Sequence, residues 1–350
     1  MSIIYHERPG VYSDYTASRV SASGEERKTV ALVGAAEAQA GLYTVTSRTD
    51  GEEVFGTQSK LGKMLAAAYE NGAGTVLVSC VETEDVAGYK AGFEKVLAEK
   101  QAAFLAVDSY ELAIQQALRD AVMAFAGQKS ECIGMVGMEL PEKAQLLERA
   151  AALDCERMVL VGPDVYGVGE TQVAGGCVAA AALCGLLAAQ TDPALPLNGA
   201  VLSGFSGVSA TYEDTDIDAL VCGGVTVLEC NAGQVTVLRG ITSKQTVGSG
   251  KDATWREMTA ILIADDVIPG IRNALAAKFP RAKNNKVTRE AIRNLVIMEL
   301  ESRLQREIIE SYDNVTAEAS STDAGVCVVK FGFTVTPGLN RIHLLAHISV

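Results

Sequence analysis

Short apolar runs alternate with amphipathic stretches along the first half of the chain. The apolar runs have the length of buried strands and occupy residues 29–34, 75–81, 103–107, 132–136 and 158–161. Apolar side chains at helical spacing fill the intervening residues 59–71, 86–100, 110–126 and 141–152. Strands and helices that alternate in this way predict a mostly parallel sheet with helices on both faces.

The longest uncharged stretch, residues 171–191, has nearly the length of a membrane span. It is rich in Ala and Gly rather than in Leu, Ile and Phe, so its transfer into lipid would be poorly favoured. We therefore expect a tightly packed, buried helix here. A membrane-associated protein that uses this stretch is an alternative, and such a protein would partition into detergent.

The alternation stops between residues 193 and 209, and an α+β pattern follows. Two apolar runs, 225–230 and 235–239, flank Asn231-Ala-Gly233, which is a strong hairpin signal. Residues 327–335 alternate apolar and other side chains, as a half-buried strand does.

Two helices are expected between the hairpin and that strand. Thr254 and Glu257 have the spacing of a capping box at the start of the first helix. Pro269 is expected to kink or stop this helix. The second helix opens near Thr288 and carries apolar side chains as far as Ile308.

The last ten residues also alternate. One face would carry Ile342, Leu344, Ala346, Ile348 and Val350, and the other His343, His347 and Ser349. A strand with one apolar face must pair and pack somewhere, because a lone strand cannot satisfy its backbone. Its partner is either its own domain or a neighbouring subunit.

These patterns predict an α/β protein of two domains with an extended arm at each end. Residues 1–27 are polar and form the N-terminal arm; residues 28–195 form an α/β domain with a mostly parallel sheet. Residues 196–336 form an α+β domain, and residues 337–350 form the C-terminal strand.

Composition narrows the possible functions. The net charge of −13 argues against a nucleic-acid binder that acts through a basic surface. The chain has three histidines, and none of its eight cysteines is spaced C-x-x-C. The cysteines are therefore expected to be reduced core residues, and the N-terminus shows no signal peptide.

No motif that would define an enzyme is complete. Gly248-Ser-Gly-Lys251 lacks the frame of a phosphate loop, and Asp252 replaces its Ser or Thr. Asp214-Thr-Asp-Ile-Asp218 begins like a calcium loop but lacks its Gly and its final Glu. We therefore expect no catalytic, metal or cofactor site.

One charge cluster stands out against the acidic background. It contains one acid, Glu290, and six bases: Lys278, Arg281, Lys283, Lys286, Arg289 and Arg293. It is either a solvated loop between two helices or a positive surface for an acidic partner protein.

Several segments together resemble the tail sheath proteins of contractile injection machines, which include contractile-tailed phages and phage-tail-like bacteriocins (tailocins). The segments are Pro9-Gly-Val-Tyr12, Gly175-Gly-Cys-Val-Ala-Ala180, Pro196-Leu-Asn198, Gly224-Val-Thr-Val-Leu228, Val237-Leu-Arg-Gly-Ile-Thr242, Trp255 and Val335-Thr-Pro-Gly-Leu-Asn-Arg-Ile342. The resemblance covers both ends and most of the second half, while residues 35–170 match only as an α/β pattern.

The resemblance implies a structural, non-enzymatic subunit without cofactors. Such subunits stack as hexameric rings around an inner tube protein, between baseplate and terminator proteins, and contract to drive the tube through a target envelope. The α+β domain would be the sheath core. The arms would complete the sheets of neighbouring subunits, through Val11 and Tyr12 at one end and the apolar face of the terminal strand at the other. Residues 13–27 and 337–341 would be flexible tethers.

The basic cluster is our candidate for a tube-facing surface, from its charge and from the position of this domain in the family.

The resemblance implies assembly in the bacterial cytoplasm, followed by a place in a virion tail or a released phage-tail-like particle, with no nucleic-acid binding or membrane insertion. A single chain with both halves argues mildly against a split type VI sheath. The alternative function is a cytosolic α/β enzyme or a protein that binds an anion at a helix N-terminus.

Overall fold

A nine-stranded sheet organises the larger part of the molecule. In the computed structural model, which describes residues 28–247, 250–251 and 255–347, the strand order is β2-β3-β1-β4-β5-β6-β10-β11-β8. The strands are β1 (Thr29–Gly34), β2 (Gly41–Val45), β3 (Val76–Cys80), β4 (Ala102–Val107), β5 (Ile133–Val136), β6 (Met158–Gly162), β8 (Ala200–Leu202), β10 (Val225–Asn231) and β11 (Gln234–Val237). All pairs from β3 to β10 are parallel, and β2, β11 and β8 add antiparallel edges. The mostly parallel α/β sheet predicted from the sequence is confirmed.

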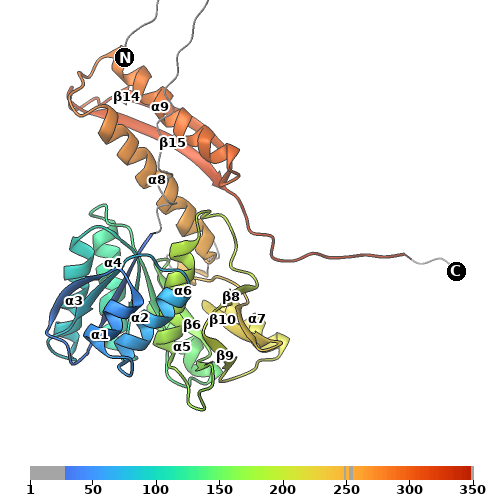
Figure 1. Cartoon of the computed structure of the whole chain (residues 1–350). Helices are drawn as coiled ribbons and strands as arrows, with labels where there is room; N and C mark the ends of the chain where they lie inside the picture. Colours follow the sequence, from blue (N-terminus) through green and yellow to red (C-terminus); the bar gives the residue numbers. More distant parts are fainter. Residues whose placement is uncertain (1–27, 248–249, 252–254, 348–350) are drawn as a thin grey trace, which may run out of the picture.

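Helices cover both faces of this sheet (Figure 1). One face packs on α1 (Arg48–Phe55), α2 (Lys60–Glu70) and α6 (Gly176–Ala189). The other packs on α3 (Val86–Ala98), α4 (Leu112–Ala126), α5 (Lys143–Leu153) and α7 (Asp214–Cys222). Side chains of β1 alternate between the two cores: Val30 and Leu32 point to one, Ala31 and Val33 to the other. Burial on both faces explains why the central strands are apolar throughout.

The uncharged stretch forms α6, which is almost completely buried against α2. Its small residues permit this contact, since a Cβ atom at Gly185 would lie 2.2 Å from the carbonyl oxygen of Ala68. The buried helix that we expected is therefore present. In the described part of the chain, no helix is long and apolar enough to cross a membrane.

The expected domain boundary at residues 195/196 needs correction. β8, β10 and β11 follow that point in the sequence, yet they extend the same nine-stranded sheet. β10 pairs in parallel with β6, and the hairpin signal at Asn231-Ala-Gly233 connects β10 to β11. We call residues 28–251 the α/β body. It also contains two short strand pairs, β7 (Val165–Gly167) with β9 (Phe205–Val208) and β12 (Thr246–Val247) with β13 (Gly250–Lys251).

A second, smaller unit extends from one end of the body (Figure 1). This small layer consists of α8 (Met258–Lys278), α9 (Lys286–Gln305), β14 (Ile309–Ala319) and β15 (Cys327–Val335). Its apolar core includes Val267, Val296 and Leu300. Ile261 and Leu262, near the start of α8, instead belong to the main core of the body, so one helix joins the two units.

α8 continues through Pro269, which the sequence predicted would kink or stop it. Packing on both sides of the proline supports the helix, and the Arg303 guanidinium donates a hydrogen bond to the Asp266 carbonyl oxygen (3.1 Å). The helix begins with Glu257 as its N-cap residue. The proposed capping partner, Thr254, lies outside the described residues.

Candidate assembly surfaces

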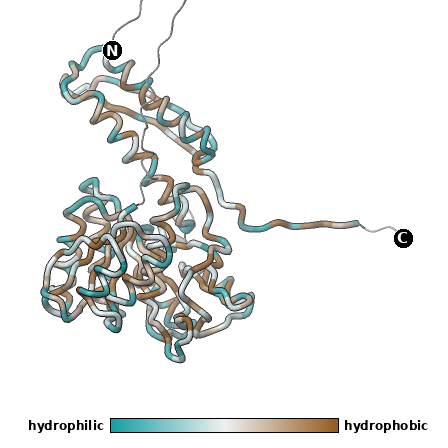
Figure 2. Tube along the Cα trace, viewed as in Figure 1, coloured by the Kyte–Doolittle hydropathy of each residue, from teal (hydrophilic) through white to brown (hydrophobic). Residues whose placement is uncertain are grey.

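The chain leaves the small layer as an exposed, apolar C-terminal segment (residues 337–347). The Thr336 amide donates a last backbone hydrogen bond to the Ile308 carbonyl (3.4 Å), and no regular structure follows up to residue 347. Its outer part runs away from the molecule (Figures 1 and 2). The side chains of Ile342, Leu344 and Leu345 are 80%, 89% and 96% exposed. Consecutive exposed apolar residues of this kind mark an interaction site.

Several predicted exchange residues are placed by the structure and others are not. Ile342, Leu344 and Ala346 are exposed on the C-terminal segment. Ile348 and Val350, and Val11 and Tyr12 of the N-terminal arm, lie outside the described residues. Leu345 is apolar and exposed as well, although it falls on the face that the sequence analysis assigned to polar side chains.

The hairpin β14–β15 has two open edges. The strands pair with each other over eight positions, and the described residues supply no third strand to this sheet. Helices α8 and α9 cover one face of it, where Phe331, Phe333 and Val335 contact the small core. Each outer edge therefore presents unpaired backbone N–H and C=O groups that can accept another strand.

Residues 337–341, predicted as a flexible tether, are attached to the α/β body. The Asn198 side-chain amide donates to Asn340 Oδ1 (2.8 Å) and to the Leu339 carbonyl oxygen (3.4 Å). Arg341 lies 3.7 Å from Asp218 of α7. No local sequence pattern reveals these side-chain contacts, which place the segment beside the body, and its role as a tether stays a prediction.

The six bases of the charge cluster gather around the turn between α8 and α9, at the end of the small layer away from the nine-stranded sheet (Figure 1). Lys278, Arg281, Lys283 and Lys286 are exposed. Arg289 and Arg293 are half-buried, donating to Asn284 Oδ1 (3.0 Å) and to the Val315 carbonyl oxygen (2.8 Å). Within the described residues, none of the six forms an ion pair. We call the first four the basic turn.

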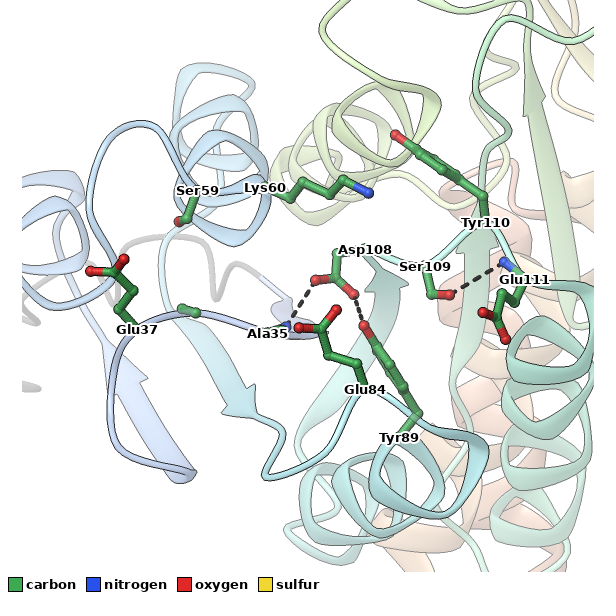
Figure 3. Close-up of a pocket in the computed structure, with 11 residues that line it drawn as sticks. Ala35, Glu37, Ser59, Lys60, Glu84, Tyr89, Asp108, Ser109, Tyr110 and Glu111 are labelled. Atoms are coloured by element: carbon green, nitrogen blue, oxygen red, sulfur yellow. Dashed lines mark hydrogen bonds between the residues drawn. The ribbon is translucent and has the colours of Figure 1, made fainter.

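The alternative function would require a ligand site in the body, and the carboxyl ends of β1, β3 and β4 do surround a cavity of about 750 Å³ (Figure 3). This is where the strand order reverses, the usual ligand position in open α/β sheets. At its base, buried Asp108 accepts hydrogen bonds from the Tyr89 hydroxyl (2.5 Å) and the Ala35 amide (2.8 Å). Burial raises the pKa of Asp108, although both hydrogen bonds oppose the shift.

The lining of this cavity disfavours an anionic ligand. Glu37, Glu84, Asp108 and Glu111 contribute four carboxyl groups, and Lys60 is the one base among the lining residues. The Lys60 ammonium lies over the Tyr110 ring, 4.7 Å from its centroid. In the part of the chain that the structure describes, no group of His, Cys, Asp and Glu is arranged to hold a metal ion.

Comparison with known proteins identifies the class of fold. Residues 250–349 match the family model described as the phage tail sheath C-terminal domain. This range contains the whole small layer and the C-terminal segment. Among curated proteins, no sequence matches the chain.

Solved structures resemble the chain over nearly its full length. The helical sheath of the anti-feeding prophage in its contracted state aligns with a TM-score of 0.74 at 16% identity, covering 97% of this chain and 99% of that one. The contracted PVC sheath of an extracellular contractile injection system gives 0.70 at 17%, covering 99% of each chain. The sheath tail protein of Desulfitobacterium hafniense gives 0.67 at 13%, covering 93% and 100%.

The chain therefore has the fold of a contractile sheath protein, and residues 250–349 match the C-terminal domain of phage tail sheaths. Both the family model and the solved structures confirm the resemblance that the sequence predicted. The contact between Asn198 and Asn340 was not predicted from the sequence. Both asparagines lie in segments on which the resemblance to sheath proteins rests. That was the one feature of the sequence that linked these two residues.

Proposed function

We propose that this chain is the subunit of a contractile tail sheath. The exposed apolar C-terminal segment carries the proposal, since the same molecule presents open strand edges that such a segment can complete. Addition of a strand from one subunit to the sheet of the next satisfies the backbone of both. Head-to-tail contacts of this kind generate helical stacks rather than closed dimers.

The assembly would consist of stacked hexameric rings around an inner tube protein, with baseplate and terminator proteins at its ends. Known structures with this fold include contracted helical sheaths and the baseplate of the anti-feeding prophage. Val11, Tyr12, Ile348 and Val350 are proposed exchange residues, together with Ile342, Leu344 and Ala346. Particles would assemble in the bacterial cytoplasm and persist as a phage tail or a released phage-tail-like particle.

The proposed mechanism is mechanical and not enzymatic. The extended sheath is a kinetically trapped assembly, and contraction releases energy stored in contacts between subunits. Each body moves as a rigid unit because its nine-stranded sheet is packed on both faces. The exchanged strands keep neighbouring subunits connected while the bodies rotate. Neither a nucleotide nor a cofactor is required.

The basic turn is proposed to face the tube. Its four exposed bases have no acidic partner among the described residues, in a chain whose net charge is −13. Exposed ion pairs contribute only about 0–1 kcal/mol each. Contacts of that strength can hold a tube in register and still break during contraction.

Deletion of residues 342–350 tests the strand-exchange proposal. We expect a folded subunit that forms no tubes in negative-stain electron microscopy, because the donor strand is gone while every described core residue remains. Leu344→Asp should have the same effect. Val168→Asp is the matched control, since Val168 is 72% exposed but lies in a loop of the body. Normal tubes from the truncated chain would contradict the proposal.

A further inference from the structure

The C-terminal segment crosses the α/β body before it becomes free. Gly338 packs against Pro196, and an added Cβ at Gly338 would lie 3.1 Å from the Pro196 Cβ atom. Asn198 then holds the side chain of Asn340 and the backbone of Leu339. Arg341 approaches Asp218. We refer to the contacts of Gly338, Leu339 and Asn340 with Pro196 and Asn198 as the clasp.

The body side of the clasp is a fixed platform. Between its two clasp residues, Leu197 is buried in the main core. The Gly199 amide donates to the Val237 carbonyl oxygen (2.8 Å), and the Ala200 amide donates to the Leu197 carbonyl oxygen (2.9 Å). Asn198 is therefore held at the rim of the nine-stranded sheet. A segment bound to it takes its direction from the body and not only from the hairpin β14–β15.

The clasp divides the C-terminal segment into an attached part and a free part. No described contact holds residues 342–347, whose large apolar side chains are the most exposed in the described chain. Six residues in extended form span about 20 Å. The free part is thus long enough to form a strand, and it starts from a point that is fixed relative to the body.

The clasp consists of weak, exposed contacts. A neutral hydrogen bond shifts an equilibrium by about fivefold. Such a clasp is closed in most free subunits, yet it opens readily when the segment is pulled. Ordering a donor segment before it docks lowers the entropic cost of association.

We infer that Asn198 and Asn340 are positioning residues that direct the donor strand toward the neighbouring subunit. This inference rests on the proposed strand exchange, but the clasp itself can be measured in isolated subunits. Without the clasp, the segment samples many directions, and only a fraction of subunits present a strand that can dock. Assembly should then require a higher subunit concentration while the fold of the subunit stays unchanged.

The first test measures the clasp in dilute, unassembled full-length protein. Trypsin cleaves after Arg341, and mass spectrometry follows release of the peptide 342–350. Asn198→Ala leaves the cleavage-site sequence intact and should raise the release rate about fivefold, because the attached residues must open before they fit the protease. Asn273→Ala, an exposed asparagine on α8, is the matched control and should leave the rate unchanged. An unchanged rate in Asn198→Ala would overturn the clasp.

The second test separates positioning from a merely structural role. Asn198→Ala and Asn340→Ala should each raise the critical concentration for tube formation about fivefold, without changing the urea midpoint of the subunit. The double variant should add little to either single one, because the residues act through one contact. Faster peptide release with an unchanged critical concentration would overturn the positioning role. Absence of tubes from the unmodified chain would overturn the proposed function, and with it the positioning role, while the protease test would still report on the clasp.

Discussion

The nine-stranded sheet and the hairpin β14–β15 differ in the length of their edge strands and in how far helices cover their faces. The sheet ends in short strands, β2 with five residues and β8 with three, and helices cover both its faces. The hairpin has strands of eleven and nine residues with helices on one face, and no other described strand pairs with either of its edges. Short edge strands limit unwanted pairing, whereas long open edges invite it.

This difference shows where the molecule is complete and where it is not. A two-stranded sheet is marginally stable without further packing. The small layer compensates through α8 and α9, but its outer edges still lack partners among the described residues. The α/β body is therefore closed by short edge strands, and the small layer is the unit that a neighbouring subunit completes in the proposed sheath.

Matched core substitutions give the largest expected effect and test this comparison directly. Leu65 on α2 and Leu300 on α9 are both fully buried. Leu65→Ala should lower the free energy of unfolding by about 3–4 kcal/mol, because its closely packed surroundings cannot collapse onto the cavity. Leu300→Ala should cost about 2–3 kcal/mol, since an open-edged layer relaxes more easily.

Urea unfolding of both variants measures the two costs, and hydrogen exchange locates them. We expect faster exchange throughout the body in Leu65→Ala, and faster exchange confined to α9 and β14 in Leu300→Ala. Equal costs with equally global exchange would mean that body and small layer form one cooperative unit.

Charge reversal in the basic turn should have an intermediate effect that appears only in assembly. The triple variant Arg281→Glu, Lys283→Glu and Lys286→Glu changes exposed side chains without ion-pair partners in the described chain. We expect co-assembly with the tube protein to fall at least tenfold at physiological salt, while tubes of sheath alone still form. Lys90→Glu with Lys95→Glu on α3 is the control. Normal co-assembly of the triple variant would remove the basic turn as a tube-facing surface.

The smallest expected effect concerns a buried acid within the complete body. Burial raises the pKa of Asp108 above its ordinary value. A raised folded-state pKa favours the protonated folded protein, so this contribution to stability is present at low pH and is lost as the pH rises through the raised pKa. In the unmodified chain, Asp108 should therefore add a small gain in stability as the pH falls from 7 toward the ordinary aspartate pKa of about 4. Asp108→Asn should abolish that gain.

Thermal melts across this pH range measure the effect. Asparagine preserves an acceptor for the Ala35 amide, so the variant should fold normally at pH 7. An identical pH dependence in both proteins would show that Asp108 does not contribute. In either case, the small layer should show no change, because Asp108 lies in the body.

Local sequence patterns determined most of the secondary structure. Apolar runs predicted strands such as β1 and β5, Asn231-Ala-Gly233 predicted the turn of a hairpin, and alternation predicted β15. These features depend on neighbouring residues, whose spacing states which side chains share a face. The apolar end of the chain was visible for the same reason, as were the bases around the α8–α9 turn.

Only the tertiary structure decided which distant segments meet. β10, β11 and β8 extend the nine-stranded sheet, so the α/β body ends well beyond residue 195. α8 continues through Pro269 because the residues on both sides of the proline are packed. Asn198 and Asn340 are 142 positions apart in the sequence. The spacing of apolar residues indicates which side chains are buried, but not which other element covers them. Strand order, the open edges and the clasp therefore follow from non-local packing alone.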